Sequence, residues 1–333
     1  MIRFAVVGLG QIGKRYEQII KSCTGAEIVA CCDIKPKDQL NRNDNSTPFY
    51  PSIEELLNSG IEIDVVIICT PNGYHASQTL LALDNKYHVV CEKPMALTRV
   101  DAEAMIQKSL QVSRNVFCVM QNRYSPPAVW LKDITSSGIL GRIFMVQVNC
   151  FWNRDERYYT PETWHGNKDL DGGTLFTQFS HFIDILYWLF GDITNIKATF
   201  RDFNHQLLTD FEDSGFVTFD FVNGGIGSFN YTTSVRDSNL ESSITIISEN
   251  GTIKVSGQYM NKVEYCKIKN YEIPKLLPSN PPNDYGSYKG SAANHHFVIQ
   301  NVVDVLTKNE PITTNAFDGL KVVDIIERIY SLK

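Results

Sequence analysis

A glycine-rich turn near the N-terminus carries the clearest chemical signal in this sequence. It reads Gly8-Leu9-Gly10-Gln11-Ile12-Gly13, after an apolar run over 2–7 that predicts a strand and before a helix expected over 11–21. In such a turn, the first glycine permits the bend, the second admits a pyrophosphate and the third lets the helix pack on the strand. The helix N–H groups and dipole then face the phosphates. The motif predicts a Rossmann unit whose cofactor contacts are Gly8, Gly10, Gln11, Ile12 and Gly13.

An aspartate at the end of the second expected strand, over 27–32, bears on which dinucleotide binds. Asp33 lies about 20 residues after Gly13, where a carboxylate can bind both hydroxyls of the adenosine ribose. A 2′-phosphate placed against it would cost roughly 4 kcal/mol at a separation of about 4 Å and an effective dielectric of about 20. Lys35, two residues on, could reach that phosphate and soften the preference. We therefore expect NAD as the cofactor.

The elements that must position these groups change in kind along the chain. Up to about residue 122, apolar strands alternate with helices, and Val65–Ile68 shows no polar alternation, as expected of a strand buried on both faces. Beyond Arg123, strand-like runs connected by turns such as Asn223-Gly224-Gly225 predict a mostly antiparallel sheet. We expect an α/β chain with a Rossmann NAD-binding domain over 1–122. An α+β substrate-binding and oligomerisation domain is expected over 123–333, with helices expected over 291–307 and 316–331 near its end.

Composition excludes several classes of function. The chain has 333 residues, of which 43% are apolar and 20% charged, and it has no uninterrupted run of 18 apolar residues, so no membrane association is expected. The first residues enter a strand directly, which leads us to expect a cytoplasmic protein. The eight cysteines form no C-x-x-C pair and no zinc-ligand spacing, so no metal is expected. A net charge of −6 without a basic stripe disfavours a nucleic-acid partner.

Three further motifs resemble those of one oxidoreductase family. Glu92-Lys93-Pro94 follows an expected strand, Cys69-Thr70-Pro71-Asn72 is followed by His75, and Asp171-Gly172-Gly173 is followed by His181 and Asp184. Together with the layout of the whole chain, these motifs resemble the Gfo/Idh/MocA family. The resemblance implies that further cofactor contacts are Thr70, Pro71, Asn72, His75, Glu92, Lys93 and Pro94.

Within that family, the chain is most similar to the UDP-N-acetylglucosaminuronate 3-dehydrogenases of lipopolysaccharide O-antigen biosynthesis. The similarity lies in 121–127, in the aromatic run 151–159 and in 285–291 with Asn294-His295. It implies oxidation of a C3 hydroxyl of a nucleotide-sugar to a ketone, with NAD as the hydride acceptor. The candidate substrate contacts are Lys93, Gln121, Arg123, Tyr124, Arg154, Tyr159, Thr177, Gln178, His181 and Lys289.

Oxidation of an alcohol also requires a base for the hydroxyl proton. Lys93 and His181 are the two candidates, and we assign the base or polarising role to Lys93, with His181 as its hydrogen-bonding partner at the substrate. Most of the family has aspartate at position 177, and the nearest group often has asparagine. Thr177 offers only a neutral hydrogen bond to an imidazole four residues away on a helix. This departure leaves open which of the two candidates is the general base.

Other interpretations remain open at this point. His181 could be a buried structural histidine, and Asp184 is interpreted as an anchor in an apolar helix. Arg154 and Arg157 could bind a carboxylate or diphosphate, and the segment around Lys289 could instead hold phosphate. Alternative functions are an NAD-dependent glycosidase of the same fold, a dehydrogenase of another sugar or cyclitol, or a non-catalytic NAD-binding subunit. An exposed sheet face would favour a homo-oligomer, a dimer or tetramer.

Overall fold

The computed structural model describes all residues except 41, 43–45 and 287. The chain forms two compact units, and each contains two separate stretches of sequence. The first unit comprises Met1–Val119 with His295–Val323, and the second comprises Met120–Asn294 with Asp324–Lys333. The domain division expected between residues 122 and 123 stays a prediction. The bounds of the two units differ from that division, because residues His295–Val323 belong to the first unit.

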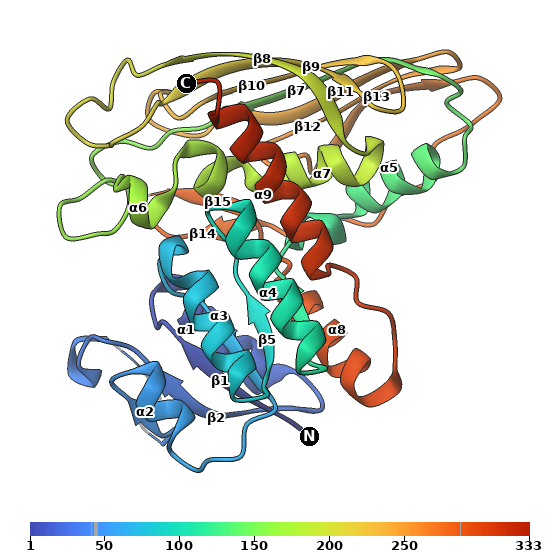
Figure 1. The fold of residues 1–333 in the computed structure, drawn as a ribbon. Coiled ribbons are helices and arrows are strands. Elements are labelled where there is room, and N and C mark those ends of the chain that lie inside the picture. The colour runs from blue at the N-terminus through green and yellow to red at the C-terminus, as the bar shows by residue number, and fades with distance from the viewer. Residues whose placement is uncertain (41, 43–45, 287) are drawn as a thin grey trace. The chain divides into compact units, whose positions relative to one another are not determined.

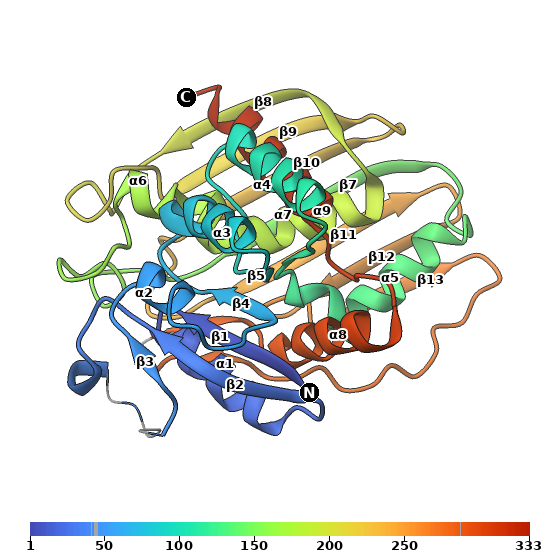
Figure 2. The ribbon, with the colours of Figure 1, turned by 60° about the horizontal axis from the view of Figure 1, so that its bottom comes forward.

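A six-stranded parallel sheet is the centre of the first unit, with the order β3-β2-β1-β4-β5-β6. Its strands, several of which are visible in Figure 2, are β1 (Ile2–Val7), β2 (Ala26–Cys32), β3 (Phe49–Tyr50), β4 (Val65–Ile68), β5 (His88–Cys91) and β6 (Val116–Cys118). Its helical elements are α1 (Gln11–Ser22), η1 (Lys37–Leu40), α2 (Ile53–Leu57), η2 (Asn72–Tyr74), α3 (His75–Asp84), α4 (Arg99–Gln111), α8 (His295–Lys308) and the first part of α9 (Ala316–Tyr330). Every residue of β4 is buried, as its uninterrupted apolar sequence predicts.

The start of α8 differs from the sequence-based expectation. A helix was expected from Ser291, but residues Lys289–Ala292 form strand β15, which pairs with β14 (Pro282–Asp284). The helix therefore begins only at His295, and it packs beside α1 in the first unit. Pairing with β14 holds residues 289–292 in an extended conformation, so they cannot form the first turn of the helix.

A seven-stranded sheet is the centre of the second unit, with the order β13-β12-β11-β7-β10-β9-β8. Its strands are β7 (Ile143–Phe151), β8 (Ile193–Arg201), β9 (Ser214–Phe221), β10 (Ile226–Thr232), β11 (Glu241–Ser248), β12 (Gly251–Ser256) and β13 (Lys262–Ile268). Adjacent strands are antiparallel except β7 and β10, which are parallel. The expected fold class, a Rossmann domain followed by a mostly antiparallel sheet, is confirmed.

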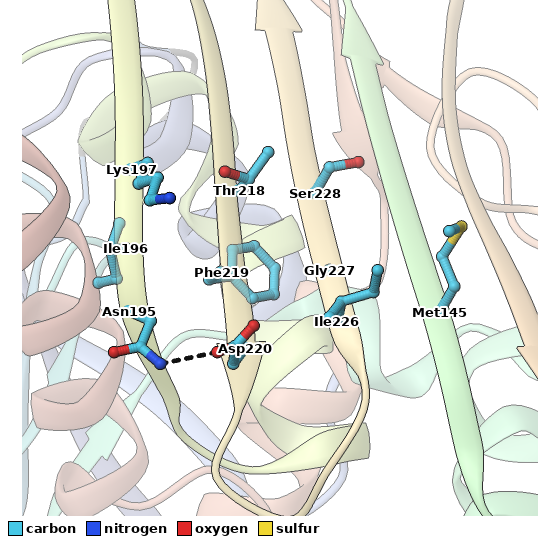
Figure 3. A pocket seen from close by; sticks show the side chains of 10 residues that line it. All are labelled: Met145, Asn195, Ile196, Lys197, Thr218, Phe219, Asp220, Ile226, Gly227 and Ser228. Carbon is cyan, nitrogen blue, oxygen red and sulfur yellow. Dashed lines mark hydrogen bonds between the residues drawn. The ribbon is translucent and has the colours of Figure 1, made fainter.

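One face of this sheet is covered by helices and the other is exposed. Figure 1 shows α5 (Pro126–Ser136) and α7 (Ser180–Phe190) on the same side of the sheet. The remaining helical elements of the unit are η3 (Gln121–Tyr124), α6 (Lys168–Asp171) and the π-helical turn η4 (Leu175–Phe179). The outer face has a hollow lined by residues of β7, β8, β9 and β10, including Met145, Lys197, Thr218 and Ile226 (Figure 3). The candidate site residues do not line this hollow.

None of the helices among the described residues has the length and apolar character that crossing a membrane requires.

Candidate active site

The glycine-rich turn has the geometry that its sequence predicts. Gly8 has φ +89°, and a Cβ there would lie 2.8 Å from the backbone of Cys69. A Cβ on Gly13 would lie 1.9 Å from the carbonyl oxygen of Gly8, so α1 could not approach β1 with any larger residue. Gly10 differs, because a Cβ there would meet nothing within 4 Å. The protein itself imposes no steric demand for glycine at position 10, which fits a backbone left bare for a ligand at the start of α1.

Asp33 is held against this turn by two backbone amides. One carboxylate oxygen accepts a hydrogen bond from the Leu9 N–H at 2.6 Å, and the other accepts one from the Lys35 N–H at 2.8 Å. The carboxylate therefore lies beside the turn at the end of β2, where an adenosine ribose must lie if the pyrophosphate faces α1. The free N–H groups of α1 and this carboxylate form a site suited to NAD.

His75 connects the two loops that follow β4 and β5. Its Nδ1 lies 2.7 Å from the carbonyl oxygen of Pro94, and its Nε2 lies 2.8 Å from that of Thr70. Burial lowers the pKa of His75 against the opposing effect of these two acceptors. The neutral ring can donate to only one carbonyl at a time. Thr70 Oγ1 in turn donates to Gln78 at 2.6 Å.

The Glu92-Lys93-Pro94 motif follows β5, with its acidic side chain directed inward. The Glu92 carboxylate accepts hydrogen bonds from Tyr16 Oη at 2.8 Å and from the Lys93 N–H at 3.1 Å. His295 Nε2 lies 3.6 Å from the same carboxylate. Burial raises the pKa of Glu92 and lowers that of His295 to about 3. These buried contacts fix the backbone of Lys93, whose side chain is partly exposed.

Two candidate residues of the second unit, Gln121 and His181, are in direct contact. The Gln121 amide nitrogen lies 3.1 Å from His181 Nε2, and both side chains are almost completely buried. Gln121 belongs to η3 and His181 to the first turn of α7. A buried ion pair joins the same two elements, because Arg123 donates to both carboxylate oxygens of Asp184, at 2.9 and 2.6 Å.

Thr177 lies in the π-helical turn that precedes α7. The regular spacing that would place residues 177 and 181 on one face therefore does not hold across this turn. The Thr177 hydroxyl donates to the carboxylate and to the carbonyl oxygen of Asp171, the latter at 3.0 Å. Asp171 also accepts from the Gly166 N–H at 2.9 Å.

Arg154 is the largest side chain that is almost fully buried in the second unit. Its guanidinium donates to Gln178 Oε1 at 3.1 Å, to the Lys289 carbonyl at 3.0 Å and to the Asn153 carbonyl at 2.5 Å. Aromatic rings surround its charge, at 4.9 to 5.1 Å from the ring centroids of Trp152, Tyr158 and Tyr288. Among the residues that the structure describes, Arg154 forms no ion pair with a carboxylate, and burial lowers its pKa.

The remaining candidates lie around this cluster or away from it. Gln178 also donates to Tyr158 Oη at 2.9 Å, and Tyr159 packs edge-on against Tyr158. The Lys289 ammonium group instead forms an exposed ion pair with Asp284, and Arg157 pairs with Asp155 at 2.6 Å. Tyr124 is partly buried in η3. Ser287, within the segment interpreted as a phosphate cradle, lies outside the described residues.

Sequence reasoning missed a buried pair that supports Arg154. His205 Nδ1 lies 3.1 Å from Asp213, and its Nε2 is hydrogen-bonded to the Arg154 carbonyl oxygen. Asp213 also accepts from the N–H groups of Phe203 and Asn204, both at 2.8 Å. Asp202, His205 and Asp213 form a compact donor group, but these hydrogen bonds already explain it as the closure of a loop. A lone histidine in a strand-rich region gave no signal for it.

The candidates thus divide between the two units. The turn, Asp33, the loops after β4 and β5, and Lys93 lie in the first, and the candidates from Gln121 to Lys289 lie in the second.

Comparison with known proteins identifies both parts of the chain. Residues 2–119 match the oxidoreductase-family domain with the NAD-binding Rossmann fold, and residues 129–254 match the C-terminal domain of the Gfo/Idh/MocA family. The match to the first domain confirms the prediction of NAD as the cofactor. Among curated relatives is the inositol 2-dehydrogenase of Salmonella typhimurium, 27% identical over 229 residues, which are 67% of this chain and 65% of that protein. The D-glucoside 3-dehydrogenase of Escherichia coli is 26% identical over 243 residues, 68% of each chain.

Two solved structures are similar over almost the whole chain. The WlbA dehydrogenase from Bordetella pertussis, in complex with NADH and UDP-GlcNAcA, is 29% identical with a TM-score of 0.88, covering 99% of this chain and 96% of its own. The WlbA dehydrogenase from Chromobacterium violaceum, with the same two ligands, is 29% identical with a TM-score of 0.86, covering 99% and 93%. With both domain models matched in order, the chain belongs to the Gfo/Idh/MocA family of oxidoreductases.

Proposed function

We propose that this chain is an NAD-dependent sugar dehydrogenase that oxidises the C3 hydroxyl of UDP-N-acetylglucosaminuronate to a ketone. The observation that carries the proposal is the similarity over 99% of the chain to two WlbA dehydrogenases crystallised with NADH and UDP-GlcNAcA. The inositol dehydrogenase of Salmonella is aligned over only 65% of its length, so it gives weaker guidance on the substrate.

The first unit supplies the residues that would hold the cofactor. The N–H groups at the start of α1 would face the pyrophosphate, and the bare backbone at Gly10 leaves room for it. The Asp33 carboxylate would accept hydrogen bonds from the ribose hydroxyls. The nicotinamide end is assigned to the loops held together by His75, which are Thr70 to Asn72 and Glu92 to Pro94. NAD, when bound, supplies the hydride acceptor.

The chain's own residues must remove the hydroxyl proton. Lys93 is the proposed base or polarising group, because it lies at the carboxyl end of a parallel strand, where α/β enzymes build their sites. The inward-facing Glu92 fixes its backbone. His181 is the proposed second contact of the reacting hydroxyl.

The second unit offers a reason for the choice of an anionic sugar. The Arg154 guanidinium is held by neutral acceptors and aromatic rings, so its positive charge is not neutralised by any ion pair among the described residues. A uronate carboxylate or a diphosphate near this cluster would complement that charge. Tyr159 and Gln178 adjoin Arg154, and we propose all three as the substrate-facing group. Tyr124, Thr177 and Lys289 remain weaker candidates, and the Arg123 charge is already paired with Asp184.

The test is NADH formation by the purified chain with NAD and a set of sugars. We expect turnover with UDP-N-acetylglucosaminuronate, and much less with UDP-N-acetylglucosamine, which lacks the carboxylate. Lys93→Ala and His181→Ala should each lower turnover about a hundredfold while NAD binding persists. Lys108→Ala is the matched control, because that lysine lies in the same unit as Lys93 and forms a surface ion pair with Asp84. Normal turnover in either site variant would remove that residue from the mechanism.

A dehydrogenase of a free sugar or cyclitol is the second candidate. The inositol and D-glucoside dehydrogenases among the relatives favour it. Turnover with myo-inositol or a glucoside, and none with a UDP-sugar, would select this function. A glycosidase that returns the hydride to its substrate would release the aglycone without net NADH.

We further infer that the protein is a homo-oligomer in the cytoplasm and serves lipopolysaccharide biosynthesis. The outer face of the seven-stranded sheet supports oligomerisation, since Phe216 is 66% and Ile226 52% exposed. Light scattering coupled to gel filtration would measure the assembly, and a monomer at micromolar concentration would contradict it. Loss of the O-antigen when the gene is deleted from its host would support the pathway.

A further inference from the structure

We infer that Gln121 is the positioning residue of His181: its side-chain amide holds the Nε2 edge of the imidazole and can serve either protonation state of the ring by turning over. The inference rests on the proposed function, because it concerns the histidine assigned to the reacting hydroxyl. It changes the role expected for Gln121, from a substrate contact to a group that acts through His181.

The contact itself is the first observation. The Gln121 amide nitrogen lies 3.1 Å from His181 Nε2, and the two side chains are 3% exposed each. The other amide atom, Gln121 Oε1, is buried with no hydrogen-bond partner among the described residues. A buried amide oxygen without a partner carries a cost, and the imidazole is the hydrogen-bonding contact that the structure gives this amide.

A second, independent observation is that an ion pair fixes the two elements that carry Gln121 and His181. Arg123 and Asp184 form a bidentate ion pair that is fully buried, and each lies two or three residues from the contact, on the same two elements. The Arg123 guanidinium also lies 5.2 Å from the centre of the Trp188 ring on α7. On the other side, Asn294 donates to the Gln121 carbonyl oxygen at 3.2 Å. The backbone of η3 is thus fixed on α7, and Gln121 meets His181 as a consequence.

The chemistry of an amide suits this position. With its NH₂ group toward Nε2, Gln121 donates to a neutral imidazole whose proton is on Nδ1. With its oxygen toward Nε2, it accepts from a ring that carries a proton there, including the imidazolium. A carboxylate can only accept, and it would favour the charged ring. The amide therefore keeps His181 oriented without adding a charge that holds its proton.

Other charged and titratable groups on the elements around α7 also affect the titration of His181. They are Arg123 on η3, Lys132 and Asp133 on α5, Asp171 ahead of η4, Asp184 on α7 itself, and Cys150 and Tyr231 on the sheet. Arg123 and Asp184 neutralise each other. A change from amide to carboxylate at position 121 alters none of these groups, so its effect on His181 can be measured as a difference.

The experiment follows His181 directly and through turnover. The imidazole NMR signals of the holoenzyme are recorded against pH, and the His181 signal is the one missing from His181→Asn. We expect Gln121→Glu to raise the pKa of His181 by roughly 1–3 units, the range for a carboxylate in contact. The pKa seen in the pH profile of kcat/KM should also rise in Gln121→Glu. Gln206→Glu adds the same charge at an exposed position of the same unit and should shift neither.

Gln121→Met tests positioning without adding charge. It keeps the length of the side chain and removes both polar atoms. We expect kcat to fall about 10- to 100-fold, the range known for groups that orient metal-bound histidines, with KM for the sugar little changed. An unchanged His181 titration in Gln121→Glu would overturn the inference. So would a raised KM at normal kcat in Gln121→Met, which would make Gln121 a substrate contact. Because the NMR titration needs no turnover, it tests the inference even where the proposed substrate fails.

Discussion

The buried ion pair between Arg123 and Asp184 permits a sharp test of how the second unit is held together. The Asp184 carboxylate is completely buried and accepts two hydrogen bonds from a guanidinium that is 3% exposed. Asp184→Asn keeps the shape of the side chain and removes its charge. The guanidinium then stays buried without that counter-charge, which costs about 3–5 kcal/mol in the free energy of unfolding. At about 2–4 °C per kcal/mol, this corresponds to a fall in Tm on the order of 10 °C.

Tryptophan fluorescence is the suitable probe for this measurement. The four tryptophans of the chain, Trp130, Trp152, Trp164 and Trp188, all belong to the second unit. Urea unfolding followed by their emission therefore reports on the unit that contains the ion pair. Asp133→Asn is the matched control, because that carboxylate is exposed on α5, and it should change stability by less than about 0.5 kcal/mol.

A double variant separates the charge from the packing. Arg123→Met with Asp184→Leu removes both charges and fills similar volume, and we expect it to recover most of the stability that Asp184→Asn loses. Turnover should stay low in the double variant, because η3 would lose the contact that fixes Gln121. A loss below about 1 kcal/mol in Asp184→Asn, or a double variant no more stable than the single one, would show that the ion pair does not stabilise the second unit in this way.

Further predictions concern the cofactor site and pH. Gly10→Ala should leave Tm unchanged, because its Cβ meets no protein atom, but it should weaken NAD binding by about tenfold or more. Gly13→Ala should lower both Tm and the affinity for NAD. If calorimetry and NAD titration gave the same changes for the two variants, this assignment would be contradicted. Asp33→Ser should weaken NAD binding and bring the dissociation constants of NAD and NADP closer together, and an unchanged ratio would contradict the assigned ribose contact. Burial lowers the pKa of His88 to about 4, and its Nδ1 accepts from the Asn115 N–H at 3.0 Å. The unfolded chain therefore binds more protons between pH ~6.5 and ~4, and stability falls as the pH drops through that window. Urea titrations at pH 8 and pH 5 would measure how much of the free energy of unfolding is lost on acidification. His88→Asn should lose about 1–2 kcal/mol less than the unmodified protein, after a discount for the partial exposure of His88. Equal losses would show that His88 is not the cause.

Local sequence was sufficient to predict the parts of the fold that local sterics determine. Gly8 and Gly13 are required by backbone contacts with the turn itself and with Cys69 just after β4, so the motif is informative without a structure. The uninterrupted apolar run of β4 predicted a buried parallel strand in the same way. Helix α8 was harder, because pairing between β14 and β15 decides where it begins.

The candidate site depends on contacts that sequence spacing does not reveal. Gln121 and His181 are 60 residues apart in the chain, and their contact follows from the ion pair that fixes η3 on α7. The π-helical turn at Thr177 breaks the regular spacing on which the sequence argument relied. Arg154 could be identified as a charged candidate, but its neutral acceptors are carbonyl and amide oxygens far away in the sequence.

The reaction of the purified chain with NAD and UDP-N-acetylglucosaminuronate tests the proposed function most directly. We expect NADH to form in an amount that matches a 3-keto product seen by NMR, and we expect both to be lost in Lys93→Ala. The absence of NADH and of any keto product, from a folded protein that binds NAD, would contradict it.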